Sequence, residues 1–231
     1  MRATPSRSAF SAMPVLRAVC WMVVCLFGGC AAPATITRAP ECRLPARAPN
    51  FSKRFVIPSR VHYLQRDRRW AADAIGGSGK ALQNVGCVIC SLSMALSRYG
   101  IDLTPGELNR ELKKVGGYNE NGWVYWSDIK VVSGGKVDVE WVREPTLGDI
   151  ERALARRQPV LVKTAPAGMV QHWVLVVGRE GREFLMRDPL DKTKSLKPLS
   201  LLGSEILAVR IVKRARPMNT TTSGSTQGAR P

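Results

Sequence analysis

The sequence predicts an α+β fold in which N-terminal helices pack on a C-terminal antiparallel sheet. Helical patterns come first along the chain, and most of the apolar, strand-like runs come later. Tight turns separate the later strands, which favours antiparallel pairing. Helices followed by a sheet are typical of α+β domains, and these three observations together select this class.

Composition supports a globular protein with an unusual charge. The chain has 231 residues, 45% hydrophobic and 23% charged, enough for one sizeable domain. Lysine and arginine number 35 against 18 acidic residues, which gives a formal net charge of +17. This excess makes an anionic surface a natural partner.

The first residues are typical of a signal peptide. Residues 1–29 contain three arginines and no acid, and Ala18–Cys30 is an apolar run too short to cross a bilayer comfortably. The run ends in "LFGGC", which resembles a bacterial lipobox with Cys30 as the lipidated residue, although Phe27 is unusual at its position. We expect an exported protein that is lipid-anchored to the cell membrane or outer membrane and faces the periplasm or exterior. Plain secretion and a retained anchor stay open.

Three segments follow the signal peptide. Residues 30–50 are rich in Ala and Pro and predict a lipid-anchored linker, residues 51–214 the folded domain, and residues 215–231 a disordered polar tail. The basic residues near the anchor are Arg43, Arg47, Lys53, Arg54, Arg60, Arg66, Arg68 and Arg69. They favour binding to an anionic membrane surface, with a merely solvated tether as the alternative. No recognition motif supports nucleic-acid binding.

Periodicity and capping residues place the elements within the domain. The predicted helices are 88–99, 104–117, 126–135 and 146–158, and the predicted strands are 136–142, 159–165, 172–180, 183–188 and 205–214. Thr104, Ser127 and Thr146 are the expected helix caps. A tight turn at 180–182 joins two of the strands.

The cysteine count argues against a disulfide framework or a metal site. Two of the six cysteines lie in the signal peptide and Cys30 is the candidate lipid site, so Cys42, Cys87 and Cys90 remain. An odd number leaves at least one free thiol. Zinc needs four ligands at recognisable spacing, and these cysteines are scattered relative to the two histidines of the chain. We therefore expect no metal and no cofactor.

Cys87 and Cys90 form a Cys-x-x-Cys pair at the start of an apolar helix. The positive end of the helix dipole favours an anion at Cys87, and Gly86 before it leaves room for a substrate carbonyl. Cys90 lies one turn inside the helix, where packing dominates. Cys87 is thus the candidate nucleophile. A redox couple and two buried, inert thiols remain alternatives.

A nucleophilic thiol needs a base, and His172 is the better candidate of the two histidines. His172 begins one strand and Asp188 ends the next, so pairing about the turn at 180–181 makes them neighbours. A carboxylate beside an imidazole fixes its tautomer and stabilises the imidazolium. His62 lies in a basic lead-in with no strand behind it. A structural role for His172 stays open.

Several motifs in order resemble a known family. They are "LQRDRRWA", "VGCVICSLSMALSRYG", "TPGELNRELKKVGGY", "GWVYW", "QPVLVK", "HWVLVVG" and "RDPL", spanning about residues 60–212. Together they resemble the double-glycine-leader, bacteriocin-processing cysteine peptidases, family thirty-nine of the cysteine peptidases. The likeness is to the stand-alone "-like" branch of that papain-like family and not to the branch fused to transporters.

The resemblance implies a papain-like fold and a set of roles. Cys87 matches the nucleophile, His172 the general base, and Asp188 the residue that orients the base. Gln65 matches the glutamine whose amide helps to form the oxyanion hole, with Gln83 as a rival because it is closer to Cys87 in sequence. The implied activity is a cysteine peptidase acting on a peptide or protein substrate.

The chain also departs from the family pattern. Val88-Ile89-Cys90 follows the nucleophile where many relatives have Gly-Pro-Thr, so Cys90 replaces a small or hydroxyl residue. This departure leaves the substrate open. The leading prediction is an envelope cysteine peptidase, and the alternatives are a peptidoglycan endopeptidase or amidase and a non-catalytic binding module on the same scaffold.

Overall fold

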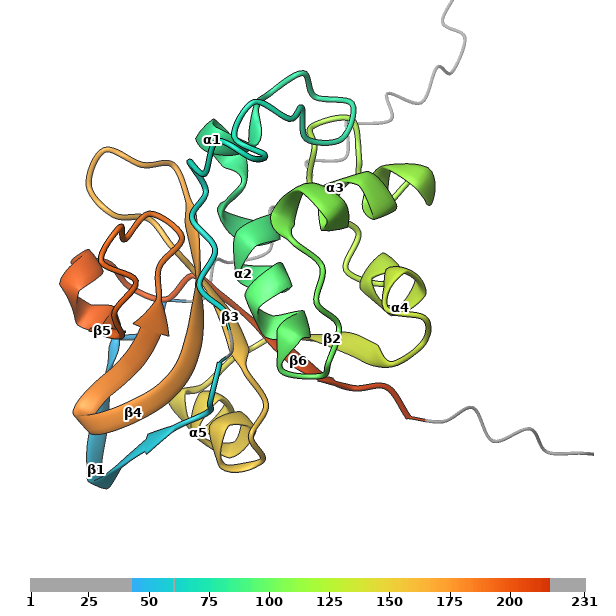
Figure 1. The fold of residues 1–231 in the computed structure, drawn as a ribbon. Coiled ribbons are helices and arrows are strands. Elements are labelled where there is room, and N and C mark those ends of the chain that lie inside the picture. Colours follow the sequence, from blue (N-terminus) through green and yellow to red (C-terminus); the bar gives the residue numbers. More distant parts are fainter. Residues whose placement is uncertain (1–42, 60, 217–231) are drawn as a thin grey trace, which may run out of the picture. The chain divides into compact units, whose positions relative to one another are not determined.

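A computed structural model describes residues 43–59 and 61–216 (Figure 1). The helices are α1 (Leu82–Val85), α2 (Cys87–Ser97), α3 (Pro105–Lys114), α4 (Asp128–Val132), α5 (Leu147–Ala155) and the 3-10 helix η1 (Leu199–Leu202). The strands are β1 (Arg47–Val56), β2 (Val137–Val142), β3 (Val160–Thr164), β4 (His172–Arg187), β5 (Lys197–Pro198) and β6 (Ala208–Arg214). The predicted α+β class is confirmed.

One antiparallel sheet of six strands forms the second layer, and all of its strands except β1 follow α1–α4 in the chain. Its order is β1-β4-β3-β6-β2, and β5 pairs with β4 outside this path. Strand β3 lies at the centre, where Thr164 pairs with His172 of β4 and Lys163 pairs with Ala208 of β6. The central strands are apolar and buried because both faces of the sheet are covered.

Strand β4 reverses direction within its length, as Figure 1 shows at the lower left. Its sixteen residues would span about 50 Å if fully extended. Yet His172 Nε2 at its start lies 2.8 Å from Asp188 Oδ1 just past its end. Gly181, with φ of +56°, lies in the turn that the sequence predicts at this point. The reversal is what brings the two ends of β4 together.

Helix α2 is the central helix and packs against β4 and β3. Ten of its eleven residues are buried, which is more than one apolar stripe would produce. Two of its three buried hydroxyls have partners: Ser91 Oγ donates to the Trp173 carbonyl at 3.2 Å, and Ser97 Oγ donates to the Met94 carbonyl at 2.8 Å. Ser93 Oγ has none among the described residues. Helix α3 covers the outer side of α2 (Figure 1).

Two of the three predicted caps are confirmed. Thr104 and Glu107 form a full capping box at the start of α3, and Thr146 and Asp149 form one at the start of α5. The prediction for Ser127 is wrong. Its backbone is already helical, and its side chain caps no N–H group.

Strand β1 begins inside the stretch that the sequence predicts as linker. Arg47 of β1 pairs with Glu183 of β4, and the Leu44 and Ile206 backbones exchange hydrogen bonds of 3.0 and 2.8 Å. The sequence does not predict this pairing, because the Ala/Pro-rich stretch lacks the alternation of apolar and polar residues that is typical of a strand. At the other end, the Ala215 N–H donates to the Lys136 carbonyl at 3.0 Å.

The predicted signal peptide, the lipidation site Cys30, most of the linker and nearly all of the tail lie outside the described residues. Within residues 43–59 and 61–216, no helix is both long enough and apolar enough to cross a bilayer.

Candidate active site

Cys87 is the first residue of α2, directly after the short helix α1. Its side chain is 7% exposed, so the thiol is largely buried but reachable. Gly86 joins α1 to α2, and the absence of a side chain at this position is what allows the two helices to follow each other directly. A Cβ on Gly86 would lie 2.5 Å from the Leu82 carbonyl oxygen, so only glycine allows α1 to meet α2 so tightly.

Cys90 differs from Cys87 in its burial and in its place within α2. It is fully buried, and burial raises the pKa of its thiol far above the usual range. Both thiols are free, so no disulfide links Cys87 to Cys90. This arrangement fits the interpretation of Cys90 as packing within α2.

His172 and Asp188 are direct hydrogen-bond partners, as the predicted pairing about the turn requires. The Nε2–Oδ1 distance is 2.8 Å, with the His172 side chain 1% exposed and the Asp188 side chain 13% exposed. The same Oδ1 also accepts the Leu190 N–H at 2.8 Å, which fixes the carboxylate from a second side. The ring is therefore held in one orientation.

The environment of His172 favours its protonated form. Burial alone lowers the pKa of the ring, but the hydrogen bond to Asp188 and the nearby Cys87 side chain outweigh burial and raise it to about 9. The second ring nitrogen, Nδ1, is buried and makes no hydrogen bond of ordinary geometry within the described residues. Such bonds often tighten only when substrate is bound. Nδ1 is thus the nitrogen available to exchange a proton during a reaction.

An arginine–tryptophan cluster supports the strand that carries His172. The ring of Trp173 lies 5.3 Å from that of Trp126. Arg210 lies over the rings of Trp126, Trp141 and Trp173 at 5.1, 5.0 and 5.7 Å. Burial lowers the pKa of Arg210 to about 10. Its cation–π contacts with the three tryptophan rings offset part of the cost of removing the charge from water.

Gln65 is held in place by the turn that follows it. Within the Gln-x-Asp-x-x-Trp stretch, the Trp70 Nε1–H donates to the Leu64 carbonyl at 2.9 Å, and the Asp67 N–H donates to the same carbonyl at 3.2 Å. The Gln65 N–H donates to the Pro189 carbonyl at 2.9 Å, which ties it to the segment after Asp188. The motif is therefore a structural device that fixes this glutamine.

The Gln65 side chain also touches the approach to the nucleophile. Its Nε2 donates to the Gln83 carbonyl at 2.9 Å, four residues before Cys87. Gln65 is 3% exposed, and its Oε1 has no partner within the described residues. Gln83 meets this site through its backbone while its side chain is exposed. The structure thus brings Gln65, and not the Gln83 side chain, into the space between α1 and Asp188.

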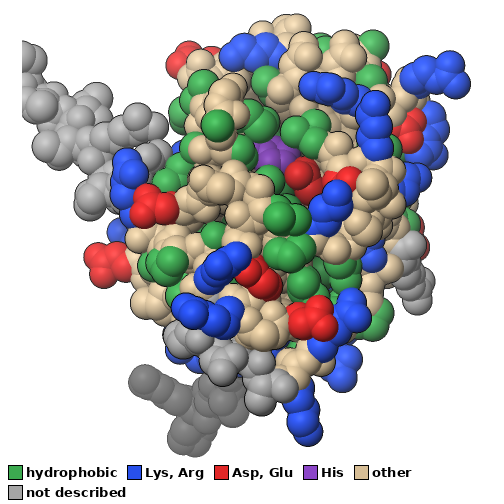
Figure 2. Space-filling view, turned by 90° about the vertical axis from the view of Figure 1, so that its left-hand side faces the viewer, with side chains coloured by type: hydrophobic (Ala, Val, Ile, Leu, Met, Phe, Trp, Pro, Cys, Tyr) green, Lys and Arg blue, Asp and Glu red, His purple; other side chains and the backbone are tan. Residues whose placement is uncertain are grey.

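His62 also belongs to this region, although no motif around it predicts that place. Its Nε2 lies 2.9 Å from the Asp188 carbonyl oxygen, and its Nδ1 lies 3.3 Å from Arg187 Nη1. The basic lead-in around His62 has no strand pattern that predicts these contacts. Figure 2 shows a histidine recessed between hydrophobic side chains, with acidic side chains beside it.

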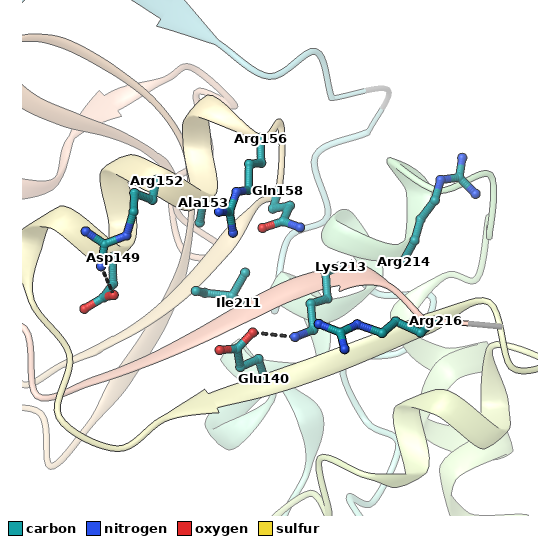
Figure 3. Close-up of a pocket in the computed structure, with 10 residues that line it drawn as sticks. All are labelled: Glu140, Asp149, Arg152, Ala153, Arg156, Gln158, Ile211, Lys213, Arg214 and Arg216. Carbon is teal, nitrogen blue, oxygen red and sulfur yellow. Dashed lines mark hydrogen bonds and ion pairs between the residues drawn. The ribbon is translucent and has the colours of Figure 1, made fainter. Parts of the chain in front are cut away.

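A separate basic groove lies between α5, β2 and β6 (Figure 3). Its volume is about 430 Å³, and it is lined by Glu140, Asp149, Arg152, Ala153, Arg156, Gln158, Ile211, Lys213, Arg214 and Arg216. Glu140 pairs with Lys213, and Asp149 pairs with Arg152. Arg156, Arg214 and Arg216 have no ion-pair partner among the described residues, so the groove carries excess positive charge. It contains none of the predicted site residues.

The described part of the chain contains no group of three or more His, Cys, Asp and Glu side chains able to hold a metal ion. The predicted residues that do meet are Cys87, His172, Asp188 and Gln65. A thiol, an imidazole with a free nitrogen, a carboxylate and an amide donor are the parts needed for acyl transfer through a covalent thioester.

Comparison with known proteins places the chain in a family. No curated protein matches it. A crystal structure from Bacillus anthracis, described as C39-like, is 18% identical, with a TM-score of 0.43, and the match covers 71% of this chain and all of the other. The family model described as the Peptidase_C39 like family matches residues 78–200, more than half of the chain and including Cys87, His172 and Asp188. The chain therefore belongs to the Peptidase_C39 like family.

Proposed function

We propose that this protein is a cysteine peptidase that hydrolyses amide bonds with Cys87, His172 and Asp188. One observation carries the proposal. A fully buried imidazole, oriented by a carboxylate at 2.8 Å, interacts with a thiol at a helix N-terminus and has a pKa raised to about 9. Such a ring is protonated at neutral pH and therefore favours a thiolate beside it.

The reaction follows from these positions. The Cys87 sulfur attacks the substrate carbonyl carbon, and the carbonyl π electrons move to oxygen, where Gln65 Nε2–H and the Cys87 N–H donate hydrogen bonds. His172 then gives its Nδ1 proton to the leaving amine as the C–N bond breaks, which leaves a thioester. Water, deprotonated by His172, attacks the thioester and releases the acid and Cys87. Asp188 holds the ring throughout.

Gln65 is suited to the oxyanion role because it is rigid. Hydrogen bonds fix its backbone to Pro189 and one amide hydrogen to the Gln83 carbonyl. The second amide hydrogen remains for the developing oxyanion. Preorganised donors of this kind typically contribute about 3–4 kcal/mol to transition-state stabilisation.

Substrate profiling of the purified full chain tests this proposal. A peptide library and peptidoglycan fragments are incubated with wild type and with Cys87→Ala, and products are identified by mass spectrometry. We expect peptide cleavage by wild type only. Cleavage of wall fragments alone would assign a peptidoglycan endopeptidase or amidase. Equal results for the two proteins would contradict hydrolysis and favour a binding module.

We further propose that the protein acts at an anionic membrane surface, held there by a lipid on Cys30. The unpaired arginines of the groove between α5, β2 and β6 add to the basic residues near the anchor and support this location. Each such charge near an anionic bilayer contributes about 1 kcal/mol. Loss of radiolabelled palmitate incorporation in Cys30→Ala is the expected result, and unchanged labelling would contradict it.

A further inference from the structure

The two contacts of His62 determine which of its ring nitrogens carries the proton. Arg187 Nη1 can only donate, so His62 Nδ1, 3.3 Å away, must accept. The Asp188 carbonyl can only accept, so His62 Nε2, 2.9 Å away, must donate. Both contacts are satisfied only by a neutral ring protonated on Nε2.

The charges around His62 agree with a neutral ring. Burial lowers its pKa, and the Arg187 guanidinium lowers it further. The hydrogen bond to the Asp188 carbonyl and the carboxylates of Asp191 and Asp188 act in the opposite direction but do not outweigh these causes. His62 is therefore an uncharged bridge at neutral pH.

The bridge holds the residue that orients His172. Asp188 lies directly after β4, and its carbonyl oxygen has two partners, the Asp191 N–H at 3.0 Å within the turn and His62 Nε2 from a distant part of the chain. His62 holds its carbonyl, and three residues later the Gln65 N–H holds the carbonyl of the next residue, Pro189, at 2.9 Å. One short segment thus fixes the backbone on which the carboxylate depends.

We propose that His62 is a positioning residue of the active site, which holds the Asp188 backbone so that its carboxylate stays on His172. Its significance for catalysis rests on the proposed function, but its effect on His172 does not require turnover. Protonation of His62 at acidic pH would turn Nδ1 into a donor facing Arg187. The bridge is therefore expected to weaken as the pH falls.

Titration of the histidine C2 protons by NMR tests this inference directly. The chain has 2 histidines, so the spectrum is simple. In wild type one histidine should titrate below 6.5 and the other near 9. His62→Leu removes both hydrogen bonds and should lower the pKa of His172 by about one unit, a tenfold change in its protonation equilibrium.

Two amide variants separate positioning from general damage. His62→Gln can donate to the Asp188 carbonyl and accept from Arg187, so it should restore the pKa of His172 to near 9. His62→Asn has the same amide on a side chain one methylene shorter, which is too short to bridge both partners. It should therefore lower the pKa of His172 as His62→Leu does. Equal His172 pKa values in wild type and the Leu and Asn variants, or no recovery with Gln, would overturn the inference. Slow alkylation of Cys87 in wild type would instead contradict the proposed function alone.

Discussion

Asp188→Asn is the substitution that most sharply tests the electrostatics of the site. Asparagine keeps the shape of aspartate and can still accept the Leu190 N–H, but it removes the negative charge from His172. The pKa of that ring rises from 6.5 to about 9 in the folded protein, which corresponds to a preference of about 3 kcal/mol for the protonated form. Without Asp188, burial opposes only the contribution of Cys87, so the pKa should fall toward or below 6.5.

The same change has a signature in stability. A histidine whose pKa is raised by folding stabilises the protein fully below its unfolded value of 6.5, and this contribution is lost as the pH rises through about 9. The free energy of unfolding of wild type should therefore decrease by up to about 3 kcal/mol across this window. In Asp188→Asn the free energy of unfolding should decrease much less over the same pH range. The assay is denaturant unfolding at several pH values beside the NMR titration, and a His172 pKa near 6.5 in both proteins would refute the reasoning.

Three further predictions concern neighbouring positions. Gln65→Ala should reduce kcat on a cleaved peptide about 10²–10³-fold, whereas Gln83→Ala keeps its backbone carbonyl and should change kcat little; equal losses would contradict the assignment. Cys90→Ser should keep Cys87 reactive but cost about 1–3 kcal/mol in unfolding free energy, because it buries a hydroxyl. Gly86→Ala should cost about 1–3 kcal/mol in the same measurement because its methyl group meets the Leu82 carbonyl; an unchanged melting temperature would contradict this.

Local chemistry made much of the fold predictable. The two partners of each capping box, at Thr104 and at Thr146, are three residues apart in the sequence. Both boxes can therefore be predicted from the local sequence alone. The contact between His172 and Asp188 follows from the turn at 180–182, which the sequence predicts, because pairing about that turn places the two residues opposite each other. Such features depend on short separations and on strict pairing geometry.

Features that depend on distant partners were not predictable. Strand β1 pairs with β4 across more than a hundred residues and lacks alternation, so its first residues fall within the predicted linker and the rest of it has no strand pattern. His62 meets Asp188 at a separation of 126 residues, and nothing around it indicates that contact. The role of Gly86 depends on the packing of α1, which its own neighbours do not reveal.

The central claim is that Cys87 is an activated nucleophile paired with His172. Iodoacetamide labelling of the full chain at pH 6, quantified for each cysteine by peptide mass spectrometry, tests it most directly. We predict rapid labelling of Cys87, almost none of the fully buried Cys90, and loss of the rapid phase in His172→Ala. Slow, equal labelling of the two cysteines, or a rate in His172→Ala equal to wild type, would contradict the account.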